Sequence, residues 1–192
     1  MSIGVMWFRR DLRLADQPAL QQALLECESV LMVYIDDFDA DPGSGDASRA
    51  WLRRSLDALS GDVAARGGRL HVLRSDAEIL LPQLVDALGA THVYASRLYE
   101  PAADARDDRI ARRLREQGIS FRRARGRVLT DASQVQTKTG GNFRVFTPFF
   151  KAAEPTWRPR SIPAPDALPS ADFPQQMARH QASIDAPTPA WD

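Results

Sequence analysis

Charged side chains that could bind a planar, anionic ligand gather at the expected carboxyl ends of the strands. An apolar run of strand-forming residues, 5–8, is followed at once by two arginines. In an open α/β sheet, ligands usually bind beyond the carboxyl ends of the strands. Arginines with aromatic neighbours suit such a ligand, because a guanidinium group stacks on rings and forms forked hydrogen bonds. The residues predicted to line this groove are Arg9, Arg10, Asp36, Asp37, Arg49 and the loop 96–100, which ends in Glu100.

The signatures of the common catalytic and cofactor sites do not occur in the sequence. It contains no G-x-G-x-x-G, no P-loop, no H-E-x-x-H and no G-x-S-x-G. The three histidines are scattered and no pair of nucleophile and base stands out, so we predict no catalytic residue and no metal site. Cys27, the only cysteine, excludes an internal disulfide and a cysteine-based zinc site. On spacing alone, the stretch after residue 8 is equally explained as a solvated polar loop.

The composition is that of a globular domain. The 192 residues are 44% hydrophobic and 26% charged, and the formal net charge is zero. Zero net charge argues against a chain that binds nucleic acid through bulk charge alone. No apolar stretch approaches membrane-spanning length and the amino terminus lacks the pattern of a signal peptide, so we expect a cytoplasmic protein with no membrane contact.

Apolar runs alternate with helical patterns over residues 5–124. We predict strands at 5–8, 30–35, 70–73, 92–95 and 119–124. The first helix is predicted at 18–28 with Asp16 as its N-cap, and the second runs from a cap at Asp46 or Ser48 to the glycines at 67–68. The third is predicted at 76–88, with Pro82 interrupting its first turns, and the fourth at 103–117. This alternation predicts an α/β fold, a Rossmann-like, doubly wound, five-stranded parallel sheet with strand order 3-2-1-4-5.

The pattern changes after the last predicted strand. Residues 135–145 read as two extended pieces around a glycine turn, a candidate hairpin, and Thr147 and Pro148 predict the start of a short helix. From Pro155 onward the chain is rich in proline and has little periodicity, which is typical of an extended linker or a tail packed on the surface. We therefore divide the chain into an α/β domain at 1–130, a hairpin and short helix completing it at 131–154, and a C-terminal linker at 155–192.

Three separated motifs resemble one family. W-F-R-R-D-L-R-L-x-D-Q-x-A-L at 7–20, G-D-A-S-R-A-W-L at 45–52 and G-G-N-F-R-V-F-T-P-F-F at 140–150 are similar to segments of DNA photolyases and cryptochromes, in the same order. The resemblance covers nearly all of residues 1–150 and identifies the chain as the family's amino-terminal, antenna-binding domain. It implies that residues 155–192 lead to a helical domain that binds FAD and DNA and is absent from this chain.

The resemblance also gives the groove a function. It implies an antenna chromophore that passes excitation to FAD, which splits cyclobutane pyrimidine dimers in DNA by electron transfer. Arg10 and Arg49 match antenna-contacting arginines of deazaflavin-binding relatives, and Glu100 and Arg106 match recurrent polar positions of the same loop. Ala102 and Ala103 replace the Asn-Glu pair of folate-binding relatives, and Leu98 replaces an aspartate of deazaflavin-binding relatives. Flavin mononucleotide or a deazaflavin is therefore expected in preference to methenyltetrahydrofolate, with an empty groove as the alternative.

The expected function is the antenna-binding domain of a deoxyribodipyrimidine photolyase. The alternatives are a cryptochrome-type blue-light photoreceptor without repair activity and a stand-alone nucleotide-binding domain; the missing phosphate-binding glycine motif counts against the latter. By itself the chain is expected to be a monomer, to bind DNA weakly or not at all, and to repair nothing.

Overall fold

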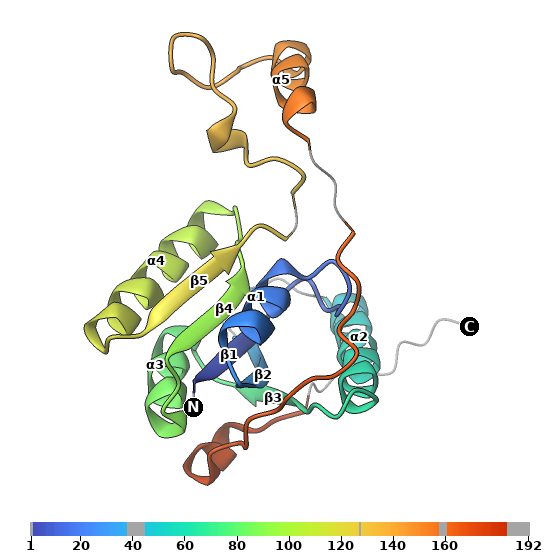
Figure 1. Ribbon diagram of the computed structural model, residues 1–192, viewed down its shortest axis with the longest axis vertical. Coiled ribbons are helices and arrows are strands. Elements are labelled where there is room, and N and C mark those ends of the chain that lie inside the picture. Colours follow the sequence, from blue (N-terminus) through green and yellow to red (C-terminus); the bar gives the residue numbers. More distant parts are fainter. Residues whose placement is uncertain (1, 38–44, 127, 158–160, 184–192) are drawn as a thin grey trace.

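A parallel five-stranded sheet forms the centre of the molecule in the computed structural model, which describes residues 2–37, 45–126, 128–157 and 161–183. The strands are β1 (Ile3–Phe8), β2 (Ser29–Asp36), β3 (Leu70–Arg74), β4 (His92–Ser96) and β5 (Ser120–Ala124). They lie in the order β3-β2-β1-β4-β5, and every pair is parallel (Figure 1). The predicted α/β class and strand order are confirmed. All five carboxyl ends therefore lie at the same edge of the sheet.

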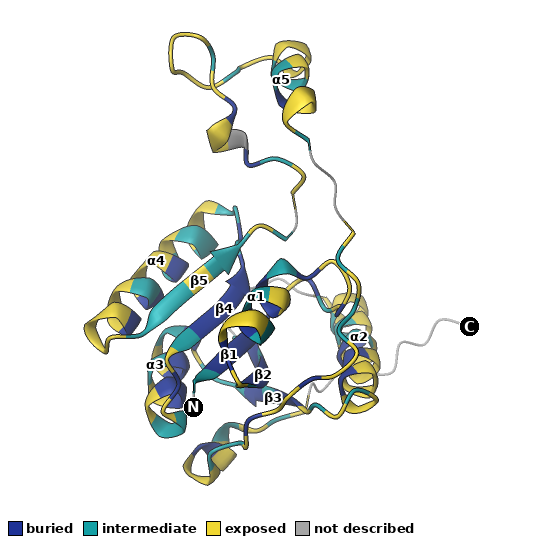
Figure 2. Ribbon diagram, in the orientation of Figure 1, coloured by how far each residue is buried: buried dark blue, intermediate teal, exposed yellow. Residues whose placement is uncertain are grey.

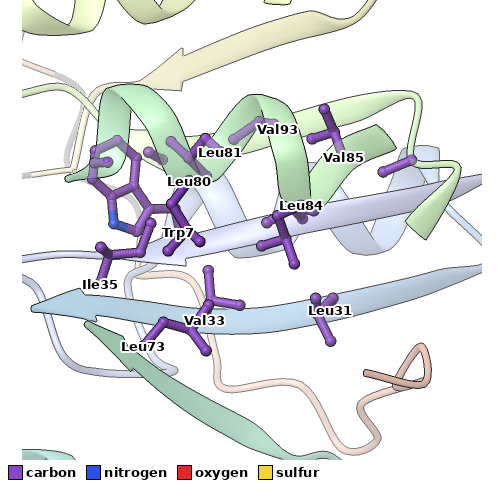
Figure 3. Close-up of a cluster of buried hydrophobic side chains, with 14 of the residues drawn as sticks. Trp7, Leu31, Val33, Ile35, Leu73, Leu80, Leu81, Leu84, Val85 and Val93 are labelled. Carbon is purple, nitrogen blue, oxygen red and sulfur yellow. The ribbon is translucent and has the colours of Figure 1, made fainter. Parts of the chain in front are cut away.

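Helices cover both faces of the sheet. The four helices are α1 (Pro18–Glu26), α2 (Asp46–Ala64), α3 (Ala77–Leu88) and α4 (Pro101–Glu116). Because alternate residues of a strand point to opposite faces, β1 sends Val5 and Trp7 into the cluster shared with α3 and α4, and Met6 and Phe8 into the cluster shared with α1 and α2. The central strands are buried almost throughout (Figure 2), and Figure 3 shows the cluster on the α3 side. None of the helices formed by the described residues has the length and apolar character that crossing a bilayer requires.

Helix α3 shows how local signals set the ends of an element. The Asp76 carboxylate accepts a hydrogen bond from the backbone N–H of Glu78 at 2.7 Å, and Gly89 ends the helix in the left-handed conformation at φ 65°. The predicted interruption at Pro82 was wrong, since the helix runs through it without a break. Proline has no N–H to give to the carbonyl four residues earlier, which is that of Glu78. The Arg113 guanidinium donates to this carbonyl instead, at 3.0 Å, and so compensates for the lost hydrogen bond.

The start of α1 also differs from the prediction. Its N-cap is Gln17, not Asp16, which instead has a φ of 48°. Asp16 is used elsewhere: its backbone N–H donates to the carbonyl of Ile162 at 2.8 Å, and its carboxylate accepts from the N–H of Ile162 at 2.7 Å. Aspartate tolerates the left-handed region better than most residues. A residue that looks like a helix cap in the sequence thus holds the C-terminal part of the chain.

Residues 128–157 form an arm beyond the carboxyl edge of the sheet (Figure 1). An antiparallel bridge between Gln136 and Asn142 supports the predicted hairpin. The short helix α5 (Phe146–Ala153) begins one residue before the predicted cap, with Val145 in the N-cap position. Aromatic rings pack within the arm, where Phe150 lies edge-on to Trp157 at 5.4 Å between centroids.

Residues 161–183 return along the sheet and pack on its surface. The carbonyl of Pro169 accepts a hydrogen bond from Val30 at 2.8 Å, Leu168 is buried against the α1 and α2 side, and Gln181 pairs with Leu73 of β3. Of the two behaviours predicted for the proline-rich segment, these residues adopt the packed tail. Residues 158–160 and 184–192 of the predicted linker lie outside the described residues, and the division into three segments stays a prediction.

Candidate functional site

A groove of about 980 Å³ lies at the carboxyl ends of β1 and β2, a size typical of ligand sites. Its wall is built by the ends of β1 and β2 and by the first turns of α2, α3 and α4. Six of the seven predicted site residues line it, namely Arg9, Arg10, Asp36, Asp37, Arg49 and Arg106. The seventh, Glu100, is bound to one of them: its carboxylate lies 2.5 Å from Arg10 Nη1. The structure therefore brings the predicted residues together at one edge of the sheet, and their contact with a ligand stays a prediction.

A buried ion pair lies beneath the floor of the groove. Arg9 is only 6% exposed, and its Nη1 lies 2.6 Å from the carboxylate of Asp107, which is fully buried on α4. Arg9 Nη2 also donates to the backbone carbonyl of Ser96 at the end of β4. Burial lowers the pKa of Arg9, and the Asp107 carboxylate offsets part of this by favouring the charged guanidinium. The guanidinium group of Arg9 is thus held in place by Asp107 and Ser96.

Arg106 extends this network toward β2. Its Nη1 lies 3.0 Å from Asp37 and its Nη2 lies 3.5 Å from Asp107. Both guanidinium groups contact the indole of Trp7, at 4.7 Å for Arg9 and 5.4 Å for Arg106 from the ring centroid. A cation over an indole face is favourable by roughly 0.5–2 kcal/mol. Trp7, Arg9 and Arg106 form a floor in which the charges are compensated.

The rim carries pairs that are open to solvent. Arg10 and Glu100 are 44% and 45% exposed, and Arg109 of α4 makes a forked contact with Glu78 of α3 at 2.5–3.0 Å. The hydrogen bonds from Arg109 lower the pKa of the Glu78 carboxyl group. A pair as exposed as Arg10 and Glu100 contributes about 0–1 kcal/mol. An anionic ligand group could therefore replace the Glu100 carboxylate at small cost, whereas the Glu78 carboxylate is only 16% exposed.

Apolar side chains complete the wall. Leu98, Ala102 and Ala103, the positions where the sequence departs from two family patterns, all line the groove. Trp51 of α2 also lines it, and this residue is 72% exposed. A planar ligand could stack on this indole between the rim arginines.

Sequence reasoning missed several residues of the site. Asp107 was not recognised, although it lies at helical spacing from Ile110 and Leu114, which form the apolar side of α4. An acid on the buried face of a helix requires a buried partner, and this signal was present in the sequence. Glu78 and Arg109 lie on separate helices, and nothing in their spacing indicated that they meet.

Asp36 turns away from this network. Its carboxylate lies 3.1 Å from Arg74 at the end of the neighbouring β3. Within the described ranges, no group of three or more His, Cys, Asp and Glu side chains could hold a metal ion. The arrangement is that of a binding groove with rings, apolar wall and exposed guanidinium groups.

A family model described as DNA photolyase matches residues 4–169. The chain belongs to the DNA photolyase family. Among curated relatives of this photolyase-family chain, the deoxyribodipyrimidine photo-lyase of Agrobacterium fabrum is 39% identical over 175 residues, 88% of this chain and 36% of that protein. Cryptochrome-2 of Arabidopsis thaliana is 33% identical over 150 residues, 77% of this chain and 24% of that protein.

Solved photolyase structures share the fold. A bacterial class III photolyase from Agrobacterium tumefaciens superposes with a TM-score of 0.83 at 37% identity, over 90% of this chain and 36% of that one. An archaeal photolyase from Sulfolobus tokodaii gives a TM-score of 0.71 at 25% identity, over 88% of this chain and 38% of that one. That protein was solved with two FAD molecules, described as implying a novel light-harvesting cofactor. The photolyase-family chain thus spans little more than a third of these proteins.

Proposed function

We propose that this chain is the antenna-binding domain of a light-dependent DNA repair lyase, and that the groove holds a planar chromophore. The observation that carries the proposal is the groove itself. Charged residues predicted from four separated parts of the sequence line one cavity, beside an exposed indole and an apolar wall. The chromophore would absorb light and pass the excitation to the FAD of the remaining part of a longer protein.

A flavin mononucleotide or deazaflavin suits the groove better than methenyltetrahydrofolate. The exposed guanidinium groups of Arg10 and Arg109 can bind a phosphate, and the ring of Trp51 can stack on a flat heterocycle. The alanines at 102 and 103 offer no polar side chain to a pterin. The archaeal photolyase solved with two FAD molecules supports a flavin in the light-harvesting role.

The test is a fluorescence titration of the 192-residue chain with flavin mononucleotide, a deazaflavin and methenyltetrahydrofolate. We expect saturable binding of a flavin-type compound and at least a tenfold loss of affinity when Arg10 and Arg49 are both replaced by alanine. Arg53→Ala is the matched control, because Arg53 lies one turn after Arg49 on α2, is solvent-exposed and does not line the groove. Unchanged affinity in the double variant would place the chromophore elsewhere.

For the longer protein we propose light-dependent splitting of cyclobutane pyrimidine dimers, with FAD and damaged DNA bound outside this chain. Relatives named deoxyribodipyrimidine photo-lyase support this reaction, while relatives named cryptochrome support a photoreceptor as the second candidate. Illumination of the longer protein with dimer-containing DNA separates the two: photoreactivation supports a lyase, and a flavin photocycle without repair supports a photoreceptor.

A further inference from the structure

One buried carboxylate is bound to both guanidinium groups of the groove floor. Asp107 is fully buried on α4, and its two oxygens lie 2.6 Å from Arg9 Nη1 and 3.5 Å from Arg106 Nη2. Asp107 does not line the groove. It therefore reaches no ligand there and can affect binding only through its two arginines.

Each of these arginines also binds a second group of the protein, and both lie against the same aromatic ring. Arg9 donates to the carbonyl of Ser96 on β4, and Arg106 binds Asp37, the residue that follows β2. Both stand against the ring of Trp7. Asp107 is the group common to the two, so it sets their positions relative to one another and to the indole.

We infer that Asp107 is the positioning residue of the groove: it holds Arg9 and Arg106 on the Trp7 ring, so that the floor has its binding shape before a ligand enters. A site whose groups are already in place pays less conformational entropy on binding. The effect on chromophore affinity rests on the function proposed above. The effect on the Trp7 environment does not, because it concerns the ligand-free chain.

The first measurement compares Asp107→Asn with Asp108→Asn in the same titration. Asparagine keeps the shape of the side chain but removes the charge that holds two guanidinium groups. We expect Asp107→Asn to weaken chromophore binding at least tenfold. Asp108 is the next residue on the same helix, is exposed and contacts Arg123 outside the groove, so Asp108→Asn should change affinity less than twofold. Equal affinity of the two variants would overturn the inference.

A second variant keeps the inference testable if Asp107→Asn does not fold. Replacing Arg9 and Asp107 together by methionine and leucine removes both buried charges, an exchange that often leaves stability unchanged or raised. We expect the double variant to unfold at the urea concentration of the wild type while chromophore affinity stays at least tenfold lower. Wild-type affinity in this folded variant would overturn the inference even if Asp107→Asn does not fold.

The last measurement needs no chromophore. The near-ultraviolet circular dichroism contributed by Trp7 is obtained by subtracting the spectrum of Trp7→Phe from that of the same chain with Trp7. It should change in Asp107→Asn, because the two guanidinium groups shift on the ring, but not in Asp108→Asn. If the wild type binds none of the three chromophores, the proposed function fails, and the spectrum still decides whether Asp107 orders the floor. A Trp7 signal unchanged in Asp107→Asn would refute the positioning role.

Discussion

Acid should loosen the contact between the C-terminal tail and the sheet through one histidine. His71 of β3 is 6% exposed, stacks on Phe173 at 4.6 Å, and accepts a hydrogen bond at Nδ1 from the Gln181 amide at 3.3 Å. Burial, with a smaller contribution from the Arg69 charge, lowers the pKa of His71 from 6.5 to about 4. The neutral ring is therefore the folded form, and protonation would remove its acceptor at Nδ1.

The sign and size follow from linkage. Above pH 6.5 the ring is neutral in both the folded and the unfolded chain, so the histidine imposes no penalty. As the pH falls from 6.5 toward 4, the unfolded chain binds a proton that the folded chain rejects, and stability is lost. At pH 4.5 the two pKa values correspond to about 2.5 kcal/mol at most, or roughly 5–10 °C in Tm for a domain of this size.

The assay is urea denaturation at pH 7.5 and pH 4.5 for the wild type and for His71→Gln. Carboxyl groups titrate over the same range in both proteins, so the difference between their two pH-dependent losses isolates His71. We expect the wild type to lose about 2 kcal/mol more than the variant. Equal losses in the two proteins would refute the reasoning, because they would mean that His71 is protonated as readily in the folded chain as in the unfolded one.

Two further predictions concern the groove and its support. Glu100→Gln should free Arg10 from its exposed ion pair and raise the affinity for flavin mononucleotide by about two- to fivefold, which corresponds to the free energy of one surface ion pair. The affinity for riboflavin, which has no phosphate, should stay the same. A gain for both compounds would contradict a phosphate contact at Arg10. Gly126→Ala should destabilise the domain by about 1–3 kcal/mol in thermal unfolding, because the added Cβ would lie 2.5 Å from the buried Ser96 hydroxyl oxygen, and a loss below 0.5 kcal/mol would show that β4 yields at this point.

Much of the fold was decided by local sequence. The apolar run that forms β2 and the alternation of strands with helices were sufficient for the sheet and its order, because right-handed crossovers leave few ways to connect parallel strands. The ends of α3 were equally readable, since Asp76 and Gly89 act within one turn of themselves. Such signals depend only on neighbours in the chain.

The partners of the charged residues at 9–13 could not be predicted in this way. Arg9 was a candidate for ligand binding, yet it is held by Asp107. Nearby, Asp11 is buried against Ser96, and Arg13 donates to the carbonyl of Gly126. Each partner comes from 85 or more positions away. A charge in a sequence shows that a partner is needed, but only the packed chain selects it.

The sequence by itself determined the sheet, the family motifs and the edge at which the groove lies. Only the tertiary structure decided which arginines face the groove opening and which form its floor, and it brought Glu78 and Arg109 together from separate helices. The physical reason is that strand and helix periodicity act over a few residues, whereas the burial of a charge depends on everything that packs around it. Arg9 and Arg10 are adjacent in the chain, and one is buried in an ion pair while the other is exposed at the rim.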